Sequence, residues 1–159
     1  LLWKILTQPH NPWVQLISKR YLKNQSLFDH VPPQSSSWQW KKLMSLRDIF
    51  KKGLRWIVGS GSEIHFWTDN WVSHKPILKF ALDTNPNLNT KVAEFLLPNN
   101  GWNIRKLKDL LPDHILQQIL TIPIPEIGTQ DKLIWGLTAD GLFSAKSAGW
   151  LAQGMDYYT

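Results

Sequence analysis

GLRWIVGSGSEIHFWTDNW, residues 53–71, carries the clearest structural pattern in the chain. Residues 54–58 and 64–68 are rich in β-branched and aromatic side chains, which favour strands. They flank Gly59-Ser60-Gly61-Ser62, where glycine adopts positive φ without a Cβ clash. The stretch therefore predicts a tryptophan-rich β-hairpin over residues 54–71, with a short polar loop.

Upstream of this hairpin, residues 1–53 predict a basic helical segment. Asn11 is a natural N-cap with Pro12 at the first helical position, and a second helix is predicted over residues 36–52, with Gly53 as its left-handed C-cap. Basic side chains bind phosphates and aromatic rings stack on bases. The candidate nucleic-acid contacts are Lys19, Arg20, Lys23, Trp40, Lys41, Lys42, Arg47, Lys51, Lys52 and Arg55. For Trp40 we favour the alternative that its ring packs inward, because aromatic side chains are usually buried.

Downstream, prolines and turn residues divide the chain into three further segments. Residues 72–100 predict an irregular connection, and residues 101–122 a helical pair broken at Pro112, with Asp113 capping its second member. Residues 131–153 predict a second hairpin that turns at Asp140-Gly141, followed by a closing helix capped by Ser144 or Ser147. The predicted fold class is α+β, with amphipathic helices flanking two small antiparallel β-hairpins, as one domain or a fragment of a larger one.

The composition limits the class of protein. The chain has 159 residues, ten tryptophans and no cysteine, which excludes a disulfide framework and a thiolate metal site. No apolar run approaches the roughly 20 residues of a membrane span, and no signal peptide is visible. We expect an intracellular chain, in the nucleus or the cytoplasm, without a membrane partner. Because it opens without methionine, we interpret it as a piece of a longer protein.

The charge is concentrated in the front of the chain. Residues 1–55 contain ten Lys or Arg and two Asp, a net charge of +8, whereas the remainder carries −2. A basic segment of this kind indicates a polyanionic partner, most simply RNA or DNA. A solvated helix surface explains the same lysines equally well.

No catalytic or metal-binding constellation is recognisable. Asp69 is interpreted as an Asx-turn residue; the alternative of a catalytic acid lacks a second carboxylate nearby. The glycine-serine loop is interpreted as a turn rather than a phosphate cradle, since no strand-to-helix junction with Lys-Ser/Thr follows it. The five histidines, His10, His30, His65, His74 and His114, show no ligand spacing. We predict no catalytic residue, no metal and no cofactor in this segment.

Two blocks of residues, taken together, resemble a known family. The first comprises Trp56, Val58, Gly59, Gly61, Ile64, Phe66, Trp67, Asp69 and Trp71, and the second Asp131, Trp135, Gly141, Phe143, Ser144, Lys146 and Ser147. Their order and separation are similar to those in the plant LINE-type non-LTR retrotransposon polyprotein, an RNA-directed DNA polymerase. Ser60 and Ala145 depart from the family pattern.

The resemblance implies a segment between the reverse-transcriptase domain and a zinc-binding and ribonuclease H region. None of the family's catalytic residues falls within this chain. The implied function is a non-catalytic connector that assists nucleic-acid binding and packs against neighbouring domains of the same polyprotein. The alternatives are a packing module without a nucleic-acid role and a carbohydrate-stacking surface at Trp67 and Trp71.

Overall fold

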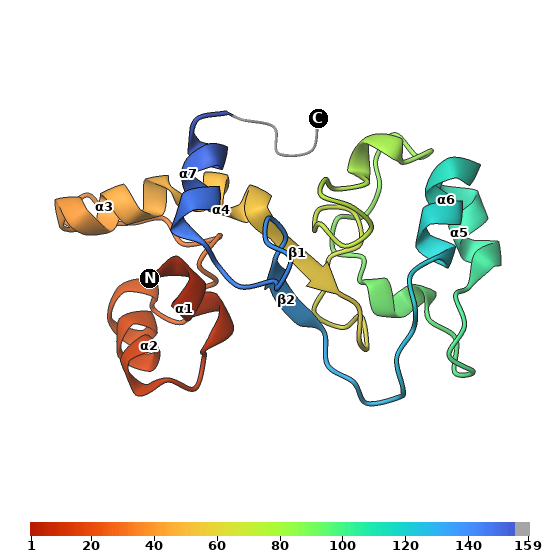
Figure 1. The fold of residues 1–159 in the computed structure, drawn as a ribbon, viewed down its shortest axis with the longest axis horizontal. Coiled ribbons are helices and arrows are strands. Elements are labelled where there is room, and N and C mark those ends of the chain that lie inside the picture. The colour runs from red at the N-terminus through yellow and green to blue at the C-terminus, as the bar shows by residue number, and fades with distance from the viewer. Residues whose placement is uncertain (155–159) are drawn as a thin grey trace. The chain divides into compact units, whose positions relative to one another are not determined.

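The computed structural model describes residues 1–154, which form two compact units (Figure 1). The first unit contains residues 1–53 together with the chain from Phe143 onward, and the second contains residues 54–142. The segment 131–153 contributes to both units. Helices and a small antiparallel sheet make up the structure, so the predicted α+β class is confirmed.

The first unit is helical. Its elements are α1 (Leu2–Thr7), α2 (Pro12–Ile17), a π-helical turn (Ser18–Leu22), α3 (Trp38–Ser45), α4 (Arg47–Gly53) and α7 (Ala145–Ala152). The predicted cap at Asn11 is confirmed, because its side chain accepts a hydrogen bond from the Trp13 N–H at 3.0 Å. The predicted cap at Ser144 is confirmed as well, since its hydroxyl accepts from the Ser147 N–H.

The single helix predicted over residues 36–52 is two helices. Ser37 caps α3 through the Trp40 N–H, and Leu46 separates α3 from α4. Gly53 lies in the last turn of α4 rather than in the left-handed region, so the predicted C-cap is wrong. The chain passes from Gly53 directly into a strand, and no reversal that would require positive φ occurs there.

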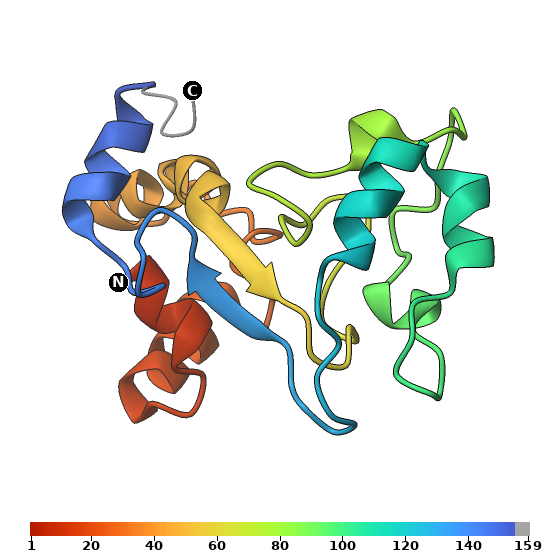
Figure 2. The same cartoon turned by 45° about the vertical axis from the view of Figure 1, so that its right-hand side comes forward.

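The sheet joins the two sequence blocks to each other. Strand β1 (Leu54–Ile57) pairs antiparallel with β2 (Lys132–Trp135), with Leu54 opposite Trp135 and Ile57 opposite Lys132 (Figure 2). Both predicted hairpins are therefore wrong. Of the second predicted hairpin, the turn is confirmed: Gly141 has φ of 72°, and the Trp135 N–H donates to its carbonyl at 2.8 Å.

Packing explains why residues 64–68 do not form the second strand of a hairpin. Successive side chains of a strand point to opposite faces of a sheet. In a two-stranded hairpin with only one covered face, either Phe66 or Trp67 would therefore be exposed to solvent. Phe66 and Trp67 are both fully buried. The backbone at Phe66 and Trp67 instead forms a turn. The Trp56 N–H of β1 donates a hydrogen bond to the Asn70 carbonyl at 2.8 Å.

An aromatic core holds the second unit together. The Phe66 ring lies 4.2 Å from the Phe95 ring and 4.7 Å from the Trp67 ring, centroid to centroid. The Trp71 indole N–H donates to the Phe66 carbonyl at 2.8 Å, and the Trp102 indole N–H donates to the Ile122 carbonyl at 3.1 Å. The indoles of Trp71 and Trp102 thus bury their apolar surface while their N–H groups stay hydrogen-bonded.

Short helices close this core. They are the 3₁₀ turns Leu78–Phe80 and Val92–Phe95 and the adjacent helices α5 (Ile104–Leu110) and α6 (Asp113–Leu120). Asp113 is the first residue of α6 and Pro112 holds the N-cap position, so the predicted cap at Asp113 is wrong. Its carboxylate still lies in the first turn, where negative charge is favourable.

Candidate nucleic-acid interface

The two structural units differ in net charge. The described part of the first unit contains ten Lys and Arg against Asp29 and Asp48, a net charge of +8. The second unit contains eight basic and nine acidic residues, a net charge of −1. The charge asymmetry seen along the sequence is therefore a property of one folded unit.

Most of the candidate basic residues lie on the surface of this unit. The exposed ones are Lys19, Arg20, Lys23, Lys41, Lys42, Lys51 and Lys52. Two of them lie over aromatic rings: the Arg20 guanidinium is 5.4 Å from the Tyr21 ring, and the Lys51 ammonium is 5.2 Å from the Phe28 ring. Such contacts leave the charged groups in water, where a phosphate can reach them.

The two candidate arginines with less exposure hold backbone in place. Arg47 Nη1 donates to the Leu27 carbonyl at 3.0 Å and to the His30 carbonyl, and so ties the loop before α3 to α4. Arg55 belongs to the second unit, where Nη2 donates to the Val72 carbonyl at 3.4 Å. Both contacts are intramolecular, and they give these side chains a packing role.

Trp40 is buried, which confirms the inward-packed alternative. Its ring stacks on Tyr21 with centroids 4.7 Å apart, and its indole N–H donates to His30 Nε2 at 3.5 Å. A base cannot stack on a ring that is already covered. As a candidate nucleic-acid contact, Trp40 is therefore wrong.

His30, beneath Trp40, is a buried neutral imidazole. Its Nε2 accepts from the Trp40 indole, so Nδ1 carries the proton and donates to Gln25 Oε1 at 3.1 Å. Burial lowers the pKa of His30, and the positive charges of Arg47 and Lys23 lower it further.

Acid is expected to destabilise the first unit through His30. The pKa of His30 is lower in the folded chain than in the unfolded chain. Below about pH 6.5 the unfolded chain therefore binds more protons than the folded chain, and the free energy of unfolding falls as the pH falls. Urea unfolding of the chain and of His30→Asn at pH 7.5 and pH 5.5 measures the effect. The expected result is a smaller acid-induced loss in the variant. Burial and Arg55 lower the pKa of His74 too, so part of the loss remains; an unchanged loss in the variant contradicts the assignment.

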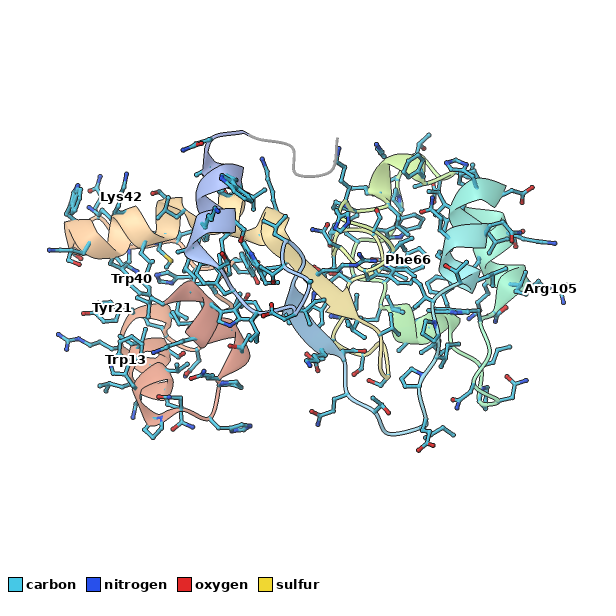
Figure 3. All side chains as sticks on the ribbon, viewed as in Figure 1. Trp13, Tyr21, Trp40, Lys42, Phe66 and Arg105 are labelled. Carbon is cyan, nitrogen blue, oxygen red and sulfur yellow. The ribbon has the colours of Figure 1, made fainter. Side chains whose placement is uncertain are left out.

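Trp38, which is not among the predicted contacts, is 73 % exposed. It lies one turn before Lys41 and Lys42 on α3, whereas the corresponding neighbours of Trp40 are Leu43 and the buried Met44. In Figure 3, Lys42 points away from the side of α3 on which Trp40 and Tyr21 meet. Helical spacing was the available signal: Trp38 shares its face with lysines, and Trp40 does not.

The glycine-serine loop of the second unit binds an anion, and this anion is the carboxylate of Asp131 in the same chain. Asp131 Oδ1 accepts from the Gly59 and Gly61 N–H groups at 2.7 and 2.8 Å, and Oδ2 accepts from the Glu63 N–H at 2.9 Å. Successive N–H groups of this kind form an anion-binding concavity. We refer to Gly59, Gly61, Glu63 and Asp131 as the Asp131 cradle.

The other motif residues serve packing. Asp69 Oδ2 accepts from the His65 N–H at 2.8 Å, four residues before it, so the predicted Asx-turn onto the following backbone is wrong. Trp67, Trp71 and Trp135 are at most 2 % exposed, and Trp56 is partly buried. The carbohydrate-stacking alternative at Trp67 and Trp71 is therefore wrong too.

Two further observations concern residues 1–154. They contain no group of three or more His, Cys, Asp or Glu side chains placed to hold a metal ion. None of their helices combines the length and the apolar character that crossing a membrane requires.

Comparison with known proteins gives two relatives. No family model and no solved structure matches the chain. It is 31 % identical over 152 residues to "Putative ribonuclease H protein At1g65750" of Arabidopsis thaliana, which covers 92 % of the chain and 24 % of that protein. It is 26 % identical over 70 residues to "Uncharacterized mitochondrial protein AtMg00310" of the same plant, covering 44 % of the chain and 46 % of that protein. The chain therefore spans about a quarter of the first relative and under half of the second.

Proposed function

We propose that the chain is a non-catalytic segment of a retrotransposon-related polyprotein, and that its first unit contacts RNA or DNA. The similarity to a quarter of a protein named for ribonuclease H supports the polyprotein context. The observation that carries the nucleic-acid role is the net charge of +8 on the described part of the first unit, where nine Lys and Arg side chains are exposed, including the seven candidate contacts.

The second unit has a different role in this proposal. Its aromatic core and the Asp131 cradle are fully occupied by contacts within the unit. It provides a rigid body that packs against neighbouring domains of the polyprotein. Chemistry on the nucleic acid belongs to other parts of the polyprotein.

Reversing charges on the first unit is expected to weaken RNA binding far more than reversing the same number on the second. The test variant carries Lys19→Glu, Lys23→Glu, Lys41→Glu and Lys42→Glu, and the matched control carries Lys75→Glu, Lys79→Glu, Lys106→Glu and Lys108→Glu. All eight lysines are exposed, and both variants change the net charge equally. Each phosphate contact that is lost should flatten the dependence of log K on log salt by about 0.7 for a single strand.

Fluorescence anisotropy with a labelled RNA, titrated between about 50 and 200 mM salt, measures both affinity and slope. We expect the test variant to lose at least about tenfold in affinity and to show the flatter slope, while the control keeps the steep one. Equal effects in the two variants, or binding by the unmodified chain that hardly changes with salt, would contradict the proposal. The packing module without a nucleic-acid role would then be favoured.

A further inference from the structure

The outer face of α3 combines an unpartnered indole with two positive charges. Trp38, Lys41 and Lys42 are all exposed, and their spacing places them within one turn on the same side of the helix. We refer to these three residues as the α3 outer face. Among residues 1–154, Trp38 is the most exposed tryptophan and its side chain makes no ring contact or hydrogen bond.

The opposite face of α3 is fully engaged, which fixes the orientation of the outer face. Trp40 and Met44 are buried, and Trp40 stacks on Tyr21 and bonds to His30. Ser37 caps the helix by accepting from the Trp40 N–H at 3.3 Å. Lys41 Nζ donates to the Gln34 carbonyl in the loop before α3, which holds its charge beside the helix start. Trp38 is therefore left exposed on the other face of the helix, three and four residues before the exposed Lys41 and Lys42.

We propose that the α3 outer face is a stacking site for an unpaired base, with Trp38 as the platform and Lys41 and Lys42 as contacts to the flanking phosphates. This inference rests on the proposed nucleic-acid role of the first unit, and it selects single strands over duplexes. Bases within a duplex are stacked on one another and present no free face to an indole. A ring beside basic side chains is the arrangement that binds single strands without sequence preference.

Charge complementarity supports a nucleic acid as the occupant. The described part of the unit around this face carries a net charge of +8, and its exposed lysines repel a basic partner and attract a phosphate backbone. Stacking of one base on an aromatic side chain is strong enough to detect, since it contributes about a tenfold change in affinity.

The decisive experiment replaces Trp38 alone. Trp38→Ala is expected to weaken binding of the chain to a single-stranded oligouridine of about 16 nucleotides by about tenfold. Trp38→Phe, which keeps an aromatic face, is expected to restore most of the affinity, and Trp38→Leu is not. Binding to an RNA duplex of the same length should change by less than about twofold in all three variants. Because Trp38 is exposed, circular dichroism should show an unchanged fold.

Trp13→Ala is the matched control. Trp13 is also exposed, but one turn after it come Leu16 and Ile17 instead of lysines. Its replacement is expected to leave single-strand binding unchanged. An equal loss in Trp13→Ala, an equal loss for the duplex, or no loss in Trp38→Ala would overturn the stacking site.

The results of the lysine reversal and of Trp38→Ala, taken together, separate this inference from the proposed function. If the four-lysine reversal of the first unit weakens RNA binding while Trp38→Ala does not, the nucleic-acid role stands and the stacking site fails. If the reversal has no effect beyond its control, the proposed function fails and the stacking site fails with it. Vesicles of phosphatidylserine and phosphatidylcholine form the last arm: binding to them that depends on Trp38, without such dependence for RNA, would assign the face to a membrane surface and overturn the inference.

Discussion

Asp131→Ala is expected to lower the free energy of unfolding of the second unit by about 3 kcal/mol, because three backbone N–H groups lose a charged acceptor. The carboxylate joins the loop after β1 to the start of β2, across 68 to 72 residues of sequence. Its removal leaves the glycine N–H groups without an acceptor inside the fold. Urea unfolding followed by tryptophan fluorescence measures the loss.

Asp131→Asn separates the hydrogen bonds from the charge. One amide oxygen can still accept from both Gly59 and Gly61, as Oδ1 does now. The amide NH₂ then faces the Glu63 N–H, and two donors cannot bond to each other. The expected loss is about half that of Asp131→Ala, together with faster hydrogen exchange of the Glu63 amide.

Asp83→Ala is the control for the Asp131 cradle. Asp83 is exposed, and its carboxylate accepts from a single backbone donor, the Asn85 N–H, at 3.0 Å. Its loss is expected to cost about 0.5 kcal/mol or less. If Asp131→Ala costs no more than Asp83→Ala, the carboxylate is not what holds the two segments together.

Gly59→Ala is the second large effect, with an expected loss of about 3 kcal/mol or more. A Cβ at Gly59 would overlap the backbone carbonyl of Gln130 and lie 2.5 Å from the Thr129 carbonyl oxygen. These atoms are backbone, and they precede Asp131 directly. Relief of the clash must therefore pull the Asp131 carboxylate away from its N–H donors, and Gly59→Ala and Asp131→Ala should be far from additive when combined.

Two other glycines calibrate the result. Gly128 has φ of 92° with open space around its Cβ position, so Gly128→Ala reports the cost of left-handed backbone alone, about 1 kcal/mol. Gly149 lies inside α7 with nothing nearby, and Gly149→Ala is expected to stabilise the chain by up to about 1 kcal/mol. A loss in Gly59→Ala no larger than that in Gly128→Ala would contradict the close approach of residues 129–130.

Local rules were sufficient for two helix caps and one turn. The caps at Asn11 and Ser144 and the turn at Gly141 depend on hydrogen bonds between residues two to six apart. Two cap predictions failed for local reasons. Gly53 and Asp113 are residue types that favour caps, but β1 begins directly after Gly53, and Pro112 holds the N-cap position before Asp113.

The sequence was sufficient to predict the positive charge of the candidate interface, but not which tryptophan is exposed beside it. Counting Lys and Arg located the basic unit, because exposed lysines need no tertiary partner. Choosing between Trp38 and Trp40 required knowing which face of α3 is covered, and Tyr21 and His30 cover the face of Trp40.

The sequence by itself determined the α+β class, the helix caps at Asn11 and Ser144 and the basic first unit, since each follows from residues near one another or from composition. Only the tertiary structure decided which strand pairs with β1 and what occupies the glycine-serine loop. A strand has no internal hydrogen bonds, so its partner is chosen by what the whole unit can bury. Here burial of Phe66 and Trp67 excluded the local hairpin, and the Asp131 carboxylate bound the loop N–H groups from about 70 residues away.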